Sequence, residues 1–497
     1  MIGFAKILVA NRGEIAIRIM RACREMGIES VAVYSEIDRT AKHVRYADEA
    51  YCIGPASSME SYLRIDRVIE TAIQSGCQAV HPGYGFLAEN PALPAACVDA
   101  GITFIGPSAE SMALLGNKTQ ARRMAVEAEI PIVPGTTEPL SDITEAEAVV
   151  RDMGLPVLLK AAGGGGGKGV RVVRSASQLR SSLEQATAEA KAAFNNPDIY
   201  IERYLERPRH VEIQVLADHH GNVVHLSERE CSVQRRFQKL IEESPSCALD
   251  QDLRHRMGEA ARRAVLASDY HNAGTVEFLL DSTGSFYFCE VNARLQVEHP
   301  VTELVTGVDI VKEQILIAQG HPLSFGQEDV VLRGAAIECR ICAEDPVTFL
   351  PSTGTITELE EPSGPGVRLD SGISEGYQVS LYYDPLISKL LVWGRDRDEA
   401  LARMKRALQE YRIKGIHTTI PFHLKALEHG SFRSGQYDTG IVQEIEHPET
   451  DIHIEVAAIA AAIVAGEDIA VELGGRSEES RWKMLGRVGN GLRRSKW

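Results

Sequence analysis

Residues 290–298 alternate polar and apolar side chains without a break, and this segment constrains the fold more than any other. The run reads Glu-Val-Asn-Ala-Arg-Leu-Gln-Val-Glu. In an extended strand, successive residues point to opposite faces, so the sequence predicts that all five polar side chains share one face. Carboxylates, an amide and a guanidinium together can hold a metal ion and an anion. A half-exposed antiparallel strand without any function shows the same alternation, and the pattern alone leaves that alternative open.

A second strand just upstream predicts a hairpin. Residues 275–280 form an apolar run with Glu277 as its lone charge, and a Ser-Thr-Gly turn signal precedes the next strand. Pairing of the two strands places Glu277 near Glu290 and Asn292. Two carboxylates and an amide oxygen suit Mg²⁺ or Mn²⁺, with water and phosphate oxygens completing the shell. The hairpin therefore predicts a metal site with a nucleotide nearby.

Composition and charge limit the possible classes of protein. A chain of 497 residues suggests about three domains. The net charge of −16 argues against a nucleic-acid partner, which favours a basic surface. We expect no secretory signal and no membrane span, because the longest apolar run, 456–465, is too short to cross a bilayer. The nine scattered cysteines fit reduced thiols, so we expect a cytoplasmic location.

Alternating strand and helix signals organise the chain into segments. Strands at 6–10 and 30–34 flank a helix at 14–26, which is typical of a parallel sheet covered by helices. A smaller α/β unit follows and is interpreted as an inserted lid, and the sequence then turns β-rich. We predict these segments: a parallel-sheet domain at 1–115, a domain at 116–330 with its lid at about 133–203, a β-rich domain at 334–445, and a tail of unknown role, considered as a docking element, at 446–497.

Five consecutive glycines at 163–167 lie between two predicted strands, with Lys160 before them and Lys168 after them. A flexible linker is the structural alternative, because ordering so many glycines costs much chain entropy. The functional interpretation is a hairpin tip whose amides and Lys168 close over phosphates. The run is not a Walker loop, which requires Ser or Thr where Gly169 stands. The short motif at 11–14 has one glycine and is interpreted as structural.

Taken together, these motifs resemble known enzyme families. The order of Lys118, Lys160, the glycine run, Glu202–Leu205 and the hairpin carboxylates is similar to the ATP-grasp enzymes. Four longer motifs look like biotin carboxylase: 9–16, 81–87, 228–236 and 290–300. The resemblance covers roughly residues 4–445.

The resemblance implies a fold and a reaction. The implied fold is α/β (α+β): an N-terminal Rossmann-like parallel sheet, an ATP-grasp domain with a mobile lid, and a C-terminal β-rich biotin carboxylase domain. The implied activity is that of a ligase. ATP and bicarbonate form carboxyphosphate, and CO₂ passes to N1 of biotin. Implied partners are a biotin carboxyl carrier protein and carboxyltransferase subunits, with the chain itself a homodimer.

The resemblance also implies a role for individual residues. ATP is expected to contact Lys118, Lys160, the amides of Gly165, Gly166 and Gly167, Glu202, Leu205, His210 and Gln234. Mg²⁺ or Mn²⁺ is expected at Glu277, Glu290 and Asn292. Bicarbonate is expected at Lys239, Arg294, Gln296, the Val297 amide and Glu298.

Glu298 is the implied base, and Arg340 is implied to stabilise the enolate-like oxygen of deprotonated biotin. Together with Lys239 and Arg294, these residues form the implied catalytic set. A carboxylate beside two cations should stay ionised, so the basicity of Glu298 must come from its position. This assignment divides residues 290–298 between two ligands, and side chains that serve two ligands need not stay on one straight strand. The second half of the segment is therefore expected to bend into a loop before Pro300.

Two positions depart from the family pattern. Phe237 stands where the family commonly has His, so no contact carries over there. Cys342 replaces the usual Asn, which leaves the immediate support of Arg340 open. The pair Cys339 and Cys342 also matches half of a redox or zinc motif, but no second pair accompanies it.

The final acceptor of the carboxyl group stays open at this point. The first assignment is the biotin carboxylase of an acetyl-CoA carboxylase. The alternative is the ATP-binding subunit of a pyruvate or other acyl-CoA carboxylase, which residues 418–423 and 434–439 resemble. No Ala-Met-Lys-Met biotinylation motif occurs, so a separate carrier is expected. Another ATP-grasp ligase and a catalytically idle ATP-binding protein are the competing interpretations.

Overall fold

The N-terminal part folds around a five-stranded parallel sheet, in a computed structural model that describes residues 3–446 except 137, 141, 163–169 and 195. The strands lie in the order β3 (Glu49–Gly54), β2 (Glu29–Ser35), β1 (Lys6–Val9), β4 (Ala79–His81) and β5 (Thr103–Phe104). The accompanying helices are α1 (Gly13–Glu25), α2 (Lys42–Tyr46), α3 (Ile65–Gln74), α4 (Ala92–Asp99) and α5 (Ala109–Gly116). All neighbouring strands are parallel, which confirms the predicted parallel sheet.

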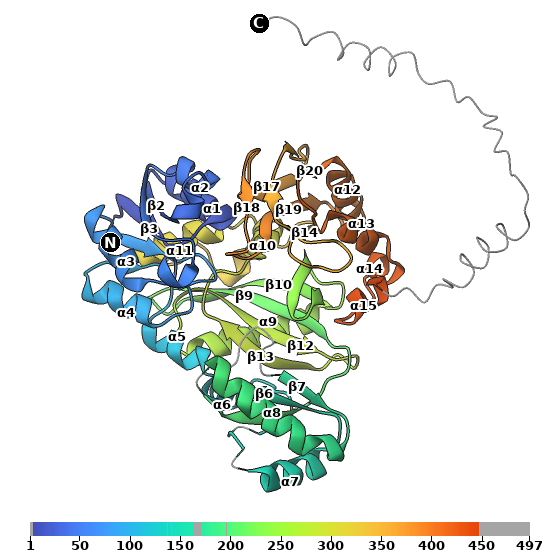
Figure 1. Cartoon of the computed structure of the whole chain (residues 1–497). Coiled ribbons are helices and arrows are strands. Elements are labelled where there is room, and N and C mark those ends of the chain that lie inside the picture. The colour runs from blue at the N-terminus through green and yellow to red at the C-terminus, as the bar shows by residue number, and fades with distance from the viewer. Residues whose placement is uncertain (1–2, 137, 141, 163–169, 195, 447–497) are drawn as a thin grey trace, which may run out of the picture. The chain divides into compact units, whose positions relative to one another are not determined.

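An eight-stranded antiparallel sheet carries the middle of the chain and continues into its C-terminal part (Figure 1). Its strands lie in the order β13 (Phe286–Asn292), β12 (Asn272–Leu280), β9 (Arg209–Ala217), β10 (Val223–Arg235), β11 (Gln238–Ser244), β14 (Ala335–Cys342), β19 (Leu386–Gly394) and β17 (Val367–Ser371). Helix α9 (Gln251–Ala267) packs on β9 and β10. Because β14 pairs with β11, the third predicted segment adds its strands directly to the sheet of the second.

The segment predicted as a lid has a small sheet and a core of its own. Its strands lie in the order β7 (Val170–Val173), β6 (Val157–Ala161) and β8 (Ile199–Arg203), and its helices are α7 (Ile143–Met153) and α8 (Ala176–Phe194). Helix α6 (Lys118–Glu127) leads into it. Leu159, Ile201 and Leu179 are buried between these elements. Gly165, Gly166 and Gly167 lie outside the described residues, so the contacts predicted for them stay predictions.

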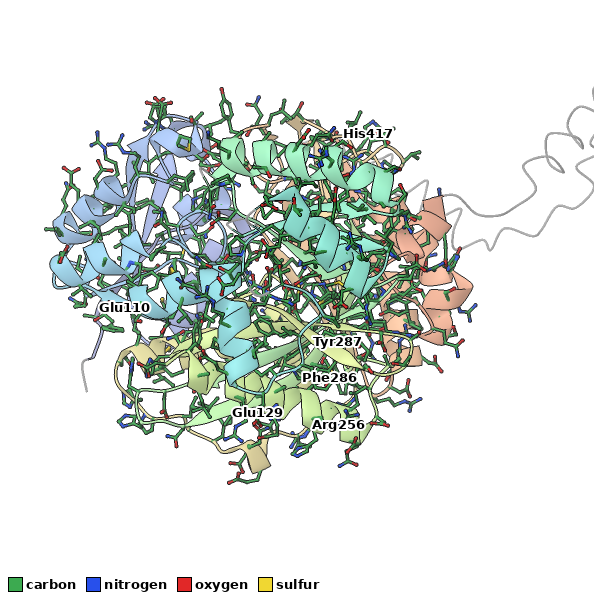
Figure 2. All side chains as sticks on the ribbon, turned by 90° about the horizontal axis from the view of Figure 1, so that it is seen from below. Glu110, Glu129, Arg256, Phe286, Tyr287 and His417 are labelled. Atoms are coloured by element: carbon green, nitrogen blue, oxygen red, sulfur yellow. The ribbon has the colours of Figure 1, made fainter. Side chains whose placement is uncertain are left out.

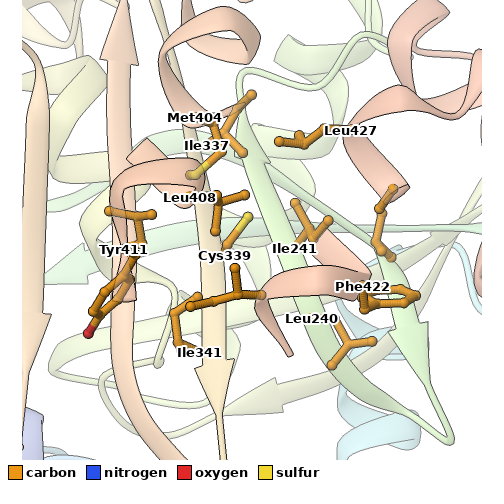
Figure 3. Close-up of a cluster of buried hydrophobic side chains, with 14 of the residues drawn as sticks. Leu240, Ile241, Ile337, Cys339, Ile341, Met404, Leu408, Tyr411, Phe422 and Leu427 are labelled. Carbon is orange, nitrogen blue, oxygen red and sulfur yellow. The ribbon is translucent and has the colours of Figure 1, made fainter. Parts of the chain in front are cut away.

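The C-terminal part packs its helices onto the eight-stranded sheet. The remaining strands are β15 (Gly354–Thr355), β16 (Glu358–Glu360), β18 (Gln378–Val379) and β20 (Arg412–Lys414), and the remaining helices are α10 (His299–Thr306), α11 (Ile310–Ala318), α12 (Arg397–Glu410), α13 (Ile420–Glu428), α14 (Gly430–Ser434) and α15 (Ile441–Glu446). Figure 3 shows Ile241 of β11 beside Ile337 of β14, Leu408 of α12 and Phe422 of α13. One apolar core therefore fixes β11 against β14. The tail predicted from 446 lies, after that residue, outside the described residues.

The predicted hairpin is confirmed, and so is the expected bend in the second half of 290–298, whereas the straight strand that alternation alone predicts ends at Asn292. Strand β12 pairs with β13 so that Glu277 is opposite Glu290 and Thr275 is opposite Asn292. Strand β13 ends at Asn292, and Glu298 is the N-cap of α10. Pro300 favours the first turn of a helix, so the chain turns before it rather than continuing as a strand.

Strand β13 is the edge of the large sheet and is covered by other parts of the chain. The amide of Phe288 donates to the Pro131 carbonyl at 2.7 Å, which pairs the free edge. The Arg256 guanidinium of α9 lies 6.0 Å from the centroid of the Phe286 ring (Figure 2). A covered edge resists pairing with another chain.

Among the described residues, every helix is too short or too polar to cross a lipid bilayer.

Phe278 tests the core beneath the hairpin. Its side chain is fully buried on β12, and its ring meets that of Phe286 edge to face at a centroid distance of 5.4 Å. We expect Phe278→Ala to lower the free energy of unfolding by about 3–5 kcal/mol, because it leaves a cavity in a packed core. Urea denaturation measures the loss. Val98→Ala at a 75% exposed position is the control, with an expected change within about 0.5 kcal/mol. An equal loss in both variants would contradict the prediction.

Candidate active site

One buried ammonium group joins three carboxylates at the centre of the large sheet. Lys239 Nζ on β11 lies 2.5 Å from Glu212 Oε2 on β9, 2.9 Å from Glu277 Oε1 on β12, and 2.6 Å from Glu298 Oε1 at the start of α10. All four side chains are nine-tenths or more buried. Four elements that are distant in sequence therefore meet at one cation.

Each of these carboxylates also meets a second cationic or ionisable partner. Arg229 Nε donates to Glu212 Oε1 at 2.5 Å, and the fully buried guanidinium also bonds to Thr275 and Thr302. His210 Nε2 lies 3.0 Å from Glu277 Oε2, and Arg340 Nη2 lies 2.9 Å from Glu298 Oε2. Buried carboxylates need such pairing, since an isolated buried charge is costly.

The pairing decides which of these carboxyl groups are ionised. Burial alone would raise the pKa of Glu298, but Lys239 and Arg340 outweigh burial and hold that pKa well below its usual range. Burial opposes ionisation at Glu277 too, yet Lys239 and His210 hold its pKa well below the ordinary value. Glu298 is therefore a carboxylate at neutral pH, as expected for a group beside two cations.

Arg340 is held from both sides. It lies on β14, where Nε donates to Glu242 Oε1 at 2.6 Å and Nη2 donates to Glu298 Oε2 at 2.9 Å. Burial raises the pKa of Glu242 to about 7, and the charge of Arg340 limits this rise. The two neighbours align the plane of the guanidinium, which is the geometry that suits an oxyanion.

The turn after β13 places the other predicted anion-binding groups. Arg294 donates to Gln296 Oε1 at 2.7 Å and to Asn292 Oδ1 at 3.0 Å. Gln296 Nε2 and Asn292 Nδ2 donate to Glu277 Oε1, at 3.2 and 2.9 Å. Arg294 also pairs with Glu89 at 3.1 Å. The structure thus joins these predicted residues to the cluster around Lys239.

The residues predicted for the nucleotide lie in neighbouring pairs. Lys118 Nζ is 3.1 Å from Glu290 Oε2, and Lys160 Nζ is 2.5 Å from Glu202 Oε2. Arg122 Nη1 also pairs with Glu202, at 2.5 Å. Gln234 Nε2 lies 3.4 Å from His210 Nδ1, and Leu205 is half-buried just after β8. The carboxylate of Glu202 is occupied by cations, so its predicted adenine contact stays a prediction.

The hairpin carries the oxygen atoms predicted to hold a divalent cation, and in this structure they face cations and hydrogen-bond donors of the chain itself. Glu277 and Glu290 are direct cross-strand neighbours, and the Asn292 side chain is bonded to Glu277. Hard oxygen ligands of this kind suit Mg²⁺ or Mn²⁺. Within the described residues, His210, Glu212 and Glu277 also have ligand atoms within 4.8 Å of one another. The predicted metal site shares only Glu277 with that second group.

A cavity of about 420 Å³ opens beside this cluster. Lys239, Arg294, Val297 and Arg340 line one part of it, and Asn11–Glu14 and Tyr84 line another. The motif at 11–14, interpreted above as structural, therefore borders the cavity. Cationic groups at the wall of a concave site are suited to a small anion and a polar substrate.

Sequence reasoning missed several members of this site. Glu212 lies in a strand whose alternation gave no separate signal. Arg229 lies within the motif at 228–236 but was given no role, and Glu89 follows the motif at 81–87. Lys389 is fully buried on β19, where Nζ donates to the Val297 carbonyl at 2.8 Å and lies 3.3 Å from Glu14 Oε2. A charged residue inside an otherwise apolar strand is the signal that could have found Lys389.

An antiparallel sheet that carries paired carboxylates, next to a small α/β unit with lysines at its base, defines the ATP-grasp class of ligases. The family models agree along the chain. Residues 3–112 match the biotin carboxylase N-terminal domain, 117–325 the ATP-binding domain of the carbamoyl-phosphate synthase L chain, and 338–444 the biotin carboxylase C-terminal domain. The chain belongs to the biotin carboxylase family, whose activity is the ATP-dependent carboxylation of biotin.

Similar proteins support this membership. A pyruvate carboxylase subunit from Methanothermobacter thermautotrophicus is 54% identical over 442 residues, which is 89% of this chain and 90% of that protein. Biotin carboxylase 1 of Bacillus subtilis is 53% identical, over 88% of this chain and 98% of that protein. A similar solved structure is the biotin carboxylase domain dimer of Hydrogenobacter thermophilus 2-oxoglutarate carboxylase, in complex with MgADP, ADP and bicarbonate. Its TM-score is 0.87 at 46% sequence identity, and the match covers 90% of this chain and 100% of that chain.

Lys239→Met tests the central cluster through its pH dependence. Glu277 and Glu298 have folded-state pKa values below the ordinary 4.5. They therefore stabilise the fold fully above pH 4.5 and lose this contribution as the pH falls through their folded-state values. We expect the variant to be about 3–5 kcal/mol less stable at neutral pH, since three buried carboxylates lose their shared cation.

The difference in free energy of unfolding between wild type and Lys239→Met should become smaller at low pH, because protonated carboxyl groups carry no charge that needs the cation. Urea denaturation at neutral pH and at about pH 3 measures both differences. A difference of the same size at both pH values would show that the paired charges do not stabilise the fold in this way.

Proposed function

We propose that Glu298, held by Lys239 and Arg340 at the wall of the cavity, is the base that activates bicarbonate in this chain. The ionised state of Glu298 carries this assignment, because only the carboxylate can accept a proton. The O–H of bicarbonate donates its proton to a Glu298 oxygen, and the resulting oxyanion attacks the γ-phosphorus of ATP. The bond between that phosphorus and the β,γ-bridging oxygen breaks, so ADP leaves and carboxyphosphate is formed. Lys239, Arg294, Gln296 and the Val297 amide hold the anion during this step.

The nucleotide occupies the adjoining side of the site in this proposal. Lys118 and Lys160 hold phosphate oxygens, together with the amides of Gly165, Gly166 and Gly167. Glu202 and Leu205 contact the adenine, and His210 and Gln234 contact the ribose. Mg²⁺ or Mn²⁺, held by Glu277, Glu290 and Asn292, neutralises charge on the transferring phosphoryl group. The ion pair between Lys118 and Glu290 supports the proposal, since it joins one of these lysines to a hairpin carboxylate.

Arg340 acts on the second substrate. Carboxyphosphate splits at its C–O bond into CO₂ and phosphate, and the phosphate accepts the N1 proton of biotin. The negative charge that this leaves on the ureido oxygen is stabilised by N–H groups of the Arg340 guanidinium, and N1 then bonds to CO₂. Glu242 and Glu298 align the guanidinium from Nε and Nη2. Because Arg340 and Lys239 line the same cavity, the carboxyl donor and its acceptor can meet there.

The partners of the reaction follow from the same proposal. Biotin is presented by a separate carrier protein, and carboxyltransferase subunits complete the complex, with the chain itself acting in the cytoplasm as a homodimer. We retain domain boundaries at 1–115, 116–330 and 334–445, which the family matches at 3–112, 117–325 and 338–444 support.

The final acceptor of the carboxyl group is acetyl-CoA in our first assignment. Pyruvate is the alternative favoured by the identity to the pyruvate carboxylase subunit of Methanothermobacter thermautotrophicus. Copurification with partner subunits decides between the two.

Biotin dependence tests the activity. Phosphate release from ATP and bicarbonate should rise when free biotin is added, because biotin consumes the carboxylated intermediate and frees the site. A coupled phosphate assay with and without biotin measures this. A turnover that biotin leaves unchanged would favour another ATP-grasp ligase, and no turnover at all would favour an idle ATP-binding protein.

Glu298→Gln tests the assigned base. The amide keeps the size of the side chain but cannot accept the proton, so we expect biotin-dependent turnover to fall by about 10²–10⁴-fold. ATP affinity, measured by calorimetry, should stay within about twofold of wild type. Glu110→Gln, on the surface at the start of α5 (Figure 2), is the matched control and should keep full turnover. Unchanged turnover in Glu298→Gln would remove Glu298 from its role.

A further inference from the structure

The backbone that carries Arg340 changes its hydrogen-bonding partner at that residue. The register between β11 and β14 ends at the pair Ile241 and Cys339, one residue before Arg340. On the other side, the pairing of β14 with β19 shifts register between Ile341 and Cys342. A strand that loses regular pairing on one side and slips on the other is poorly fixed by the sheet alone.

Two buried side chains at the start of α13 take over where β11 stops. His423 Nε2 lies 2.7 Å from the Arg340 carbonyl oxygen, and Thr419 Oγ1 donates to the same oxygen at 3.0 Å. The amide of Cys342 donates to Thr419 Oγ1 at 3.0 Å, and the amide of Thr419 donates to the Cys342 carbonyl at 3.1 Å. Thr419 and His423 are both fully buried. These contacts stand in for the inter-strand hydrogen bonds that β11 no longer makes with β14 beyond Cys339.

The chemistry of His423 fits a fixed donor. Burial lowers the pKa of His423 to about 4, so the ring is neutral at physiological pH. A carbonyl oxygen only accepts hydrogen bonds, and Nε2 therefore carries the proton. Nδ1 is buried and has no hydrogen-bond partner among the described residues. The shorter polar contact of the ring, at 2.7 Å, is with the backbone of Arg340, and Nε2 also lies 3.2 Å from Thr419 Oγ1.

We propose that Thr419 and His423 are positioning residues that hold the β14 backbone so that Arg340 faces the biotin. This inference rests on the role proposed above for Arg340. Glu242 and Glu298 align the guanidinium of Arg340. The position of its Cα atom, however, depends on the backbone at 340–342. The usual Asn is absent at Cys342, and Thr419 supplies the hydroxyl that bonds to the amide of that residue.

The experiment separates positioning from general stability by comparing two rates of the full chain. Thr419→Val and His423→Leu remove the polar contacts while keeping the approximate size of the side chains. Each should lower biotin-stimulated turnover by about tenfold, as small displacements of a catalytic group do. Phosphate release without biotin and the KM for ATP should stay within about twofold. Thr419→Ser and His423→Gln retain a donor and should restore most of the loss.

Tyr411→Phe is the matched control. It removes a buried hydroxyl from the same apolar core, and among the described residues that hydroxyl is bonded to Ser388, at 2.8 Å, rather than to the backbone at 340–342. It should leave the ratio of the two rates at the wild-type value. If Thr419→Val and His423→Leu lower both rates equally, or if Tyr411→Phe lowers the ratio as they do, the contacts are merely structural and the inference is wrong.

Arg340→Gln distinguishes this failure from a failure of the proposed function. If Arg340→Gln abolishes the stimulation by biotin while Thr419→Val and His423→Leu retain it, only the positioning role is overturned. If Arg340→Gln is still stimulated by biotin, the role proposed for Arg340 is wrong. The inference that Thr419 and His423 position Arg340 for that role is then wrong as well.

Discussion

The contact of Lys239 with three carboxylates is the interaction on which the site depends. Glu212, Glu277 and Glu298 come from two strands and the start of a helix, and each is within 2.9 Å of the ammonium group. A buried charge is tolerated only when its partners are held in good geometry. The sheet must therefore keep β9, β11 and β12 in register, because a slip of one residue would turn these side chains to the opposite face.

The pairing of β11 with β14 extends this constraint into the C-terminal part of the chain. It brings Arg340 within 2.9 Å of Glu298, although the two residues belong to different predicted segments. The apolar core around Ile241 and Ile337 stabilises this pairing from the other face of the sheet. The group assigned to bicarbonate and the group assigned to biotin are thus joined by one sheet rather than by a contact between loops. Such support is what a catalytic geometry requires.

The hairpin was predictable because its information is local. Alternation with a period of two, a turn signal and a lone Glu277 were enough to predict that this residue lies near Glu290 and Asn292, and the structure pairs it with Glu290. The residue at which the strand ends, Asn292, was harder to predict from the pattern. The alternation of polar and apolar residues continues to Glu298, although these residues no longer pair with a neighbouring strand. Glu212 carried no signal of its own, and the motif at 228–236 did not show which group Arg229 contacts, because only the order of the strands brings these two residues together.

The sequence by itself determined the class of fold, the hairpin and, through its long motifs, the family and the residues expected at the site. Periodicity and motif spacing are local properties, so they survive without knowledge of the tertiary structure. Only the tertiary structure decided which cation each carboxylate meets, and those contacts hold the pKa of Glu298 well below its usual range. It also decided that α13 supports the backbone of Arg340. Both depend on contacts between distant segments, and burial makes those contacts strong because little water remains to screen them.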